Sequence, residues 1–154
     1  MNQTSATINN NEALASLAVG YLLKVYGTIS AAKVMLILPF ILHPPTVRKL
    51  RGSSLKRSLE EFIVKSPECF ISFNARFNDY LPLSVNAVTI LQEMNIISIV
   101  RDQITYNHAS NFSPEYSSHV GKRADDFFVA INTLADLFRD QNENSLYLKL
   151  KIEL

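Results

Sequence analysis

The chain has 154 residues and a net charge of +1, and 47% of its residues are hydrophobic against 19% charged. This length fits one domain that buries enough surface to fold without a metal, and the single cysteine, Cys69, excludes an internal disulfide. The balanced charge excludes a chain that is attracted as a whole to nucleic acid or to an acidic membrane. The apolar surplus predicts either an unusually large core or a surface that a partner protein covers.

The longest apolar run covers residues 34–42 and contains Pro39, whereas a membrane-spanning helix needs about 20 apolar residues. No Lys or Arg precedes Lys24, so the positive start of a secretory signal is missing. We therefore expect a cytoplasmic protein without membrane contact.

Residues 1–10 are polar and rich in asparagine, which predicts a frayed tail, and residues 11–154 are expected to form a single helical domain. Asn11 is a suitable cap for a first helix, whose apolar residues recur at helical spacing up to Gly27. Ser30 is expected to begin a second helix, apolar on every side.

Two further signals concern the helices that follow. Pro39 is expected to kink the second helix. Ser58 and Glu61 have the spacing of a capping box, which predicts a helix that runs to about Lys65.

The middle of the chain has the outline of a winged helix. Pro67 and Pro82 are expected to begin two successive helices, and Asn95 fits a left-handed helix end. Residues 96–100 and 104–106 are β-branched and predict a hairpin with a three-residue turn. The predicted fold class is therefore mainly α with a small β element.

A long helix is expected after Pro114, with an apolar stripe that suits either a partner helix or the body of the domain. The stripe consists of Val120, Ala124, Phe127, Ile131, Leu134 and Phe138. Residues 146–154 then alternate between apolar and polar, which predicts a half-buried C-terminal strand. Such a strand must join the hairpin or pair with another chain. The candidate partner-binding residues are Tyr147, Leu148, Lys149, Leu150, Lys151 and Ile152.

Little positive charge accompanies the winged outline. Between residues 67 and 100 the one basic residue is Arg76, against Glu68, Asp79 and Glu93. Because cations that neutralise phosphates dominate nucleic-acid affinity, the pattern favours protein binding over DNA reading. A dimeric winged-helix transcription regulator, dimerising through the stripe of the long helix, remains the alternative, since an outward Asn86 is able to read adenine.

One basic cluster stands apart from this outline. It consists of Arg48, Lys49, Arg51, Lys56 and Arg57, with no acidic residue between them. A solvated loop explains the cluster, and so does a rim that contacts phosphates or an acidic partner.

The residue pattern predicts no catalytic centre, metal site or cofactor. The three histidines, His43, His108 and His119, lack the short spacing of metal ligands. Neighbouring Asp125 and Asp126 point about 100° apart on a helix, so they do not share a proton or a metal. Motifs for a nucleophile elbow, a phosphate loop or a dinucleotide site are missing. Cys69 is expected to be a buried, reduced thiol.

Three stretches carry a family resemblance. Residues 36–48 read Leu-Ile-Leu-Pro-Phe-Ile-Leu-His-Pro-Pro-Thr-Val-Arg, residues 82–87 read Pro-Leu-Ser-Val-Asn-Ala, and residues 146–154 close the chain. Together they resemble the middle component of bacterial three-component ABC-ATPase systems of the Lamassu-like anti-phage group. Val47 departs from the family pattern, in which the threonine is followed directly by arginine.

The resemblance implies a non-catalytic adaptor subunit in a hetero-oligomeric defence complex. Such a subunit joins an SMC/Rad50-like ABC ATPase to an effector, often a nuclease, that is activated when the complex senses foreign DNA. DNA would then be contacted mainly through the complex. The resemblance assigns no role to any single residue.

Overall fold

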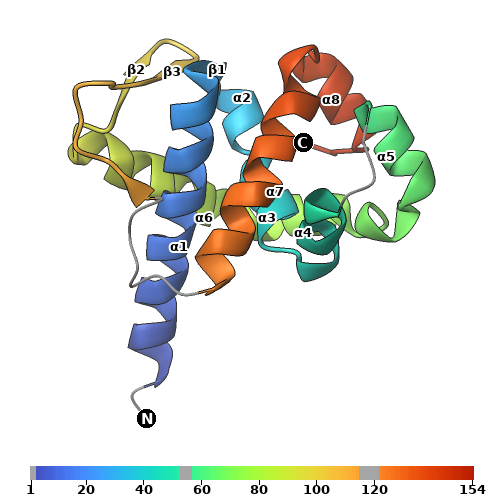
Figure 1. Cartoon of the computed structure of the whole chain (residues 1–154), viewed down its shortest axis with the longest axis horizontal. Helices are drawn as coiled ribbons and strands as arrows, with labels where there is room; N and C mark the ends of the chain where they lie inside the picture. The colour runs from blue at the N-terminus through green and yellow to red at the C-terminus, as the bar shows by residue number, and fades with distance from the viewer. Residues whose placement is uncertain (1–2, 53–56, 115–121) are drawn as a thin grey trace.

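The computed structural model of the protein describes residues 3–52, 57–114 and 122–154 (Figure 1). The helices are α1 (Gln3–Tyr26), α2 (Ala31–Val34), α3 (Ile37–Ile41), α4 (Pro44–Arg51), α5 (Leu59–Lys65), the 3₁₀ turn η1 (Pro67–Cys69), α6 (Phe73–Glu93), α7 (Lys122–Arg139) and α8 (Glu143–Lys149). The strands are β1 (Thr28–Ser30), β2 (Ile97–Val100) and β3 (Gln103–Tyr106). This confirms a mainly α fold with a small β element. Within the described ranges, no helix is both long enough and apolar enough to cross a membrane.

The centre of the domain is α3, every residue of which is buried. It contacts α1, α4, α6 and α7. The ring of Phe40 lies 4.7 Å from Phe73 and 5.8 Å from Phe138, measured between ring centroids. A helix without a polar face has to be surrounded, so these four helices pack around it. The expected all-round apolar helix is thereby confirmed.

The chain enters α3 differently from the prediction. Ser30 caps α2, accepting a hydrogen bond from the Lys33 amide, as expected. The helix breaks at residues 35–36, however, before it reaches Pro39. Pro39 lies in the first turn of α3, where its missing N–H leaves no helical hydrogen bond unmade. The helix is therefore interrupted near Pro39 as predicted, but the break lies one turn before the proline.

The hairpin is present, and it belongs to an antiparallel sheet of order β1-β3-β2. Val100 pairs with Gln103, so the turn consists of Arg101 and Asp102 alone and is shorter than predicted. Arg101 takes a positive φ of 58°, which supplies the backbone conformation that glycine usually provides. The third strand is β1, in which Ile29 pairs with Ile104.

The prediction of two helices at Pro67 and Pro82 is wrong, because α6 runs through Pro82 without a break. Pro82 is exposed, whereas buried residues on both sides of it, from Phe73 to Leu91, face the core. Burial of this continuous face outweighs the cost of about 3 kcal/mol for an interior proline. The predicted left-handed end at Asn95 is confirmed by its φ of 57°.

The predicted C-terminal strand is also wrong, because residues 143–149 form α8. The Asn142 side chain accepts a hydrogen bond from the Ser145 amide at 2.8 Å and so begins the helix. Leu146 and Leu150 are buried one helical turn apart. The helix ends where Lys151 takes a φ of 55° and the Ile152 amide bonds the Tyr147 carbonyl at 3.0 Å. An alternating pattern this short also fits a helix that buries one residue per turn.

The apolar stripe of α7 packs inside the domain. Phe127, Ile131, Leu134 and Phe138 are buried, and α7 contacts α1 and α4. Val120 lies outside the described residues. The described part of the stripe is thus core, which contradicts dimerisation through this face.

Lys33 joins three helices at the end of α7. Although it is buried, its Nζ donates to the Phe138 carbonyl and to the Tyr26 hydroxyl, at 3.2 Å each. The Tyr26 hydroxyl donates to the same carbonyl at 3.3 Å. This carbonyl belongs to the last turn of α7, where a positive charge is favourable.

Replacing Lys33 with methionine should destabilise the domain by about 2 kcal/mol, because the Phe138 carbonyl loses a charged hydrogen-bond donor. Unfolding in denaturant, followed by circular dichroism, measures the change. Lys65→Met is the matched control, since Lys65 is exposed and its ion pair in the described part of the chain is with Glu61 on its own helix. Equal stability of the two variants would contradict the role of Lys33.

Candidate interaction surfaces

The predicted basic cluster is divided in the structure. Lys56 lies outside the described residues, Arg48, Lys49 and Arg51 occupy the last turn of α4, and Arg57 precedes α5. The local geometry follows from the sequence: Pro44 opens α4, and positive charges in the last turn complement the helix dipole.

Two of these cations are paired with acids that are distant in the chain. The Lys49 ammonium lies 3.4 Å from a carboxylate oxygen of Glu68, and the Arg51 guanidinium lies 3.0 Å from that of Asp126. Arg48 forms no ion pair with any residue in the described ranges. The surface around α4 therefore carries charges of both signs. It is not the plain basic patch that the sequence suggested, either as a solvated loop or as a phosphate-contacting rim.

A cavity of about 360 Å³ lies beside α4, between it and the start of α7. It is lined by Ile41, Leu42, Pro44, Val47, Arg48, Arg51, Asp126 and Phe127. Ile41, Val47 and Phe127 are buried, so the floor is apolar, while the charged residues supply the rim.

His43, Thr46 and Cys69 form a polar contact beneath α4. His43 Nδ1 lies 2.7 Å from Thr46 Oγ1, and Thr46 also hydrogen-bonds the Cys69 thiol. Burial, together with the charges of Arg76 and Arg48, lowers the pKa of His43, so its ring is neutral near pH 7. Burial raises the pKa of Cys69, and the cysteine is buried and unpaired as expected.

In the part of the chain that the structure describes, no three His, Cys, Asp or Glu residues lie close enough to hold a metal ion. Asp125 is exposed, whereas Asp126 turns to Arg51. The side chains of the two neighbouring aspartates thus point to different surroundings, one to solvent and one to Arg51, as their helical spacing predicts.

The C-terminal residues predicted to meet a partner contact the domain itself. The Tyr147 hydroxyl donates to the Ala32 carbonyl at 2.8 Å, and its ring packs edge-on against Phe77. Leu150 is buried and Ile152 is half-buried. Leu148 and Lys151 remain exposed. Residues 146–154 therefore do not form a free strand edge with which another chain could pair.

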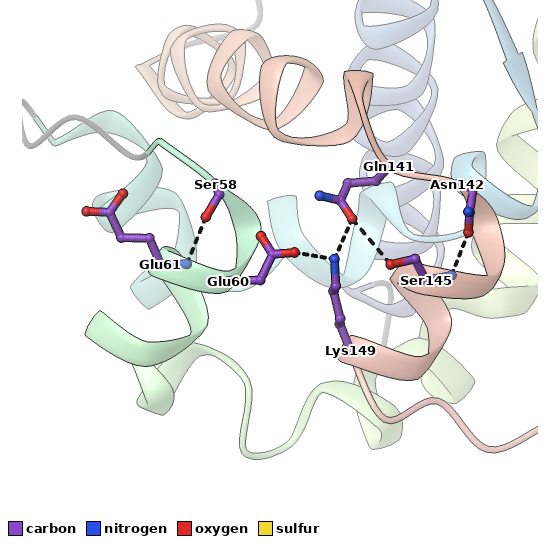
Figure 2. A network of polar contacts seen from close by, with 7 residues as sticks. All are labelled: Ser58, Glu60, Glu61, Gln141, Asn142, Ser145 and Lys149. Carbon is purple, nitrogen blue, oxygen red and sulfur yellow. Dashed lines mark hydrogen bonds and ion pairs between the residues drawn. The ribbon is translucent and has the colours of Figure 1, made fainter.

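Lys149 instead joins α5 to α8, as Figure 2 shows. Its Nζ donates to Glu60 on α5 and, at 2.7 Å, to Gln141 Oε1 before α8. The hydrogen bond from Lys149 is the largest cause that lowers the pKa of Glu60 to about 2.

The helix start at Ser58 follows the predicted capping box with one change. Ser58 Oγ accepts from the Glu61 amide at 3.1 Å (Figure 2). The Glu61 carboxylate accepts from the amide of Arg57 at 2.8 Å rather than from that of Ser58. Both bonds still satisfy donors at the start of α5.

The exposed face of α6 carries Val85, Asn86, Thr89, Gln92 and Glu93. This face lacks cations, because the one basic residue of α6, Arg76, points to hydrogen-bond acceptors within the domain. Arg76 donates to the carbonyls of Pro39 and Cys69, at 3.2 and 2.6 Å, and to Ser72 Oγ at 2.7 Å. The charge deficit read from the sequence is therefore a real property of this face.

Sequence reasoning missed two groups of exposed apolar side chains. Val64 on α5 is 79% exposed and Ile71 after η1 is 85% exposed. Met94 after α6 is 63% exposed and Val100 on β2 is 69% exposed. For Val64 and Val100 the only sequence signal is an apolar residue off the buried face of a helix or strand, whereas Ile71 and Met94 lie outside these elements and carry no such signal.

Lowering the pH should weaken the junction between α5 and α8. The pKa of Glu60 is about 2 in the folded protein and about 4.3 in an unfolded chain, so its stabilisation is complete above about pH 5.5 and is lost as the pH falls towards 2. Because Glu60 is half exposed, we expect at most about 1 kcal/mol. Denaturant unfolding of wild type and Glu60→Gln across this range measures the effect.

Lys149→Met is the matched variant for this prediction. It should remove most of the same pH dependence, and the double variant should show no less pH dependence than Glu60→Gln alone, because Glu60 is the group that titrates. Additive losses would show that the two residues act independently.

Comparison with known proteins identifies the chain at the level of a family. The family model described as ABC-three component (ABC-3C) system Middle Component 3 matches residues 11–154. No curated protein and no solved structure matches the chain. The match confirms the resemblance to a middle component, whereas the Lamassu-like assignment stays a prediction. It includes α4 with its cavity, α6 and the C-terminal α8, so the surfaces described above are those of a member of the ABC-three component system Middle Component 3 family.

Proposed function

We propose that this middle component is a non-catalytic, cytoplasmic adaptor of an anti-phage defence complex. It bridges an SMC/Rad50-like ABC ATPase and an effector, which in such systems is often a nuclease activated by foreign DNA. Family membership supports the presence of other components as partners. The residue pattern, without catalytic motifs, supports a role in binding rather than in catalysis.

The observation that carries the proposal is the separation of the two exposed apolar groups. One group, Val64 and Ile71, belongs to α5 and the segment after η1, and the other, Met94 and Val100, belongs to the end of α6 and the hairpin. Figure 1 places the β2–β3 hairpin and α5 at opposite ends of the molecule. An adaptor needs two surfaces that two partners occupy at the same time, and methionine and other apolar residues suit the centre of such surfaces.

The lack of cations on the exposed face of α6 supports a protein, rather than nucleic acid, as the partner at the hairpin end of the molecule. The order α1, β1, α2–α3, α6, β2 and β3, with sheet order β1-β3-β2, resembles that of a winged helix with an insertion before α6, and this resemblance supports the proposal. In this arrangement α6 takes the place of the recognition helix. Its exposed face offers no cation to a phosphate, so we assign it to protein contact.

Two substitutions should separate the two partners. When the three components of the system are co-expressed, Ile71→Glu should release one partner and Val100→Glu the other, because each places a charge within one apolar surface. Affinity purification through this chain, followed by quantification of each component, measures the result. Asn144→Glu, on an exposed polar site of α8, is the control that adds the same charge.

Failure of the wild-type chain to retain either component would refute the adaptor role. Loss of both components in each variant would mean that the partners share one surface, which contradicts a bridge.

A winged-helix DNA-binding regulator is the second candidate, favoured by the element order and by the exposed Asn86. The Asn86 side chain donates to Glu12 at 3.4 Å, and an acid beside it repels phosphates. We therefore expect the purified chain alone to bind duplex DNA weakly and without sequence preference. Electrophoretic mobility shift against a genomic fragment library checks this, and selective binding that Asn86→Ala abolishes would favour the regulator.

A further inference from the structure

The cavity beside α4 combines an apolar floor with a cation, Arg48, that has no ion pair among the described residues. We infer that it receives a large apolar side chain of a partner protein, while a carboxylate of the same partner segment pairs with Arg48. The inference rests on the proposed adaptor function and specifies the chemistry of one of its contacts.

The floor explains the apolar half of the recognition. Ile41 belongs to the central helix α3, Val47 to the buried face of α4, and Phe127 to α7, so three packed helices hold the cavity open. Its volume of about 360 Å³ lies at the small end of the roughly 300–1,000 Å³ range of ligand pockets. This suits one or two side chains, and anchors that fill such pockets dominate many protein interfaces.

The rim explains the charged half. Arg51 is held by Asp126 at 3.0 Å, which neutralises both groups and keeps them at the edge of the cavity. Arg48 lines the same cavity and has no ion pair in the described part of the chain. Among the described residues that line the cavity, two guanidinium groups face one carboxylate, which leaves one positive charge for a partner carboxylate to complement.

Nucleic acid fits this site less well. Phosphate binding draws on several free cations, whereas Lys49 is already paired with Glu68 and Arg51 with Asp126. An apolar floor contributes nothing to a phosphate contact, but it accounts for an apolar anchor next to an acid.

Charge reversal at Arg48 tests the inference in the co-expressed three-component complex. Arg48→Glu should reduce retention of one component by about tenfold or more at physiological salt, because like charges then face each other across the contact. Lys49→Glu is the matched control, since Lys49 is the next residue of α4 and does not line the cavity. Arg48→Lys keeps the charge and should retain most of the binding.

Pro44→Glu is a second, independent variant. Pro44 is exposed at the cavity and stands in the first turn of α4, where an acid is compatible with the helix dipole. The added carboxylate should pair with Arg48 and release the same component as Arg48→Glu. Thermal unfolding confirms that both variants are folded.

The outcomes separate this inference from the adaptor role. If the wild-type chain retains the other components and Arg48→Glu and Pro44→Glu retain them equally well, the inference is wrong while the adaptor role stands. If the wild-type chain retains none, both are wrong. If Arg48→Glu, Lys49→Glu and Arg57→Glu weaken duplex DNA binding equally while the components are still retained, Arg48 contacts a DNA phosphate and not a partner carboxylate, and the inference is wrong.

Discussion

Complete burial of α3 is the constraint on which the rest of this domain depends. A helix that has no polar side can exist in water only when other helices cover it all round. α1, α4, α6 and α7 provide that cover, although they come from widely separated parts of the chain. Phe40, Phe73 and Phe138 meet at its centre.

This arrangement decides which surfaces remain for partners. The stripe of α7, which by itself suits a partner helix, is used up in covering the core. The C-terminal segment is held by the Tyr147 hydroxyl and by Lys149, so its backbone is not offered as a strand. Among the described residues, the surfaces that remain include the cation-free face of α6, the two exposed apolar groups, exposed Leu148 on α8 and the cavity beside α4. All of them lie on elements that the core holds in place.

Signals that act over a few residues were predicted well. The cap at Ser30, the capping serine Ser58, the left-handed end at Asn95 and the hairpin are all present, because each depends on bonds between near neighbours. The failures share a different cause. Pro82 and residues 146–154 were assigned from local preference, and in both places burial against distant elements outweighed that preference.

The candidate site shows the same division. The sequence identified Arg48, Lys49, Arg51, Lys56 and Arg57 as a cluster. The acids that pair with two of them, Glu68 with Lys49 and Asp126 with Arg51, come from other parts of the chain, so the net charge of the surface was not visible. The sequence did show the charge deficit of α6 itself, because residues 77–93 contain no Lys or Arg.

The amino-acid sequence by itself thus determined the fold class, the local helix and turn signals, and the balance of charge, because these depend on residue identity and short spacing. Tertiary structure alone decided which apolar residues are core and which are exposed, which cations are neutralised, and where the cavity lies. These properties arise from contacts between residues far apart in the chain, and no local pattern encodes them.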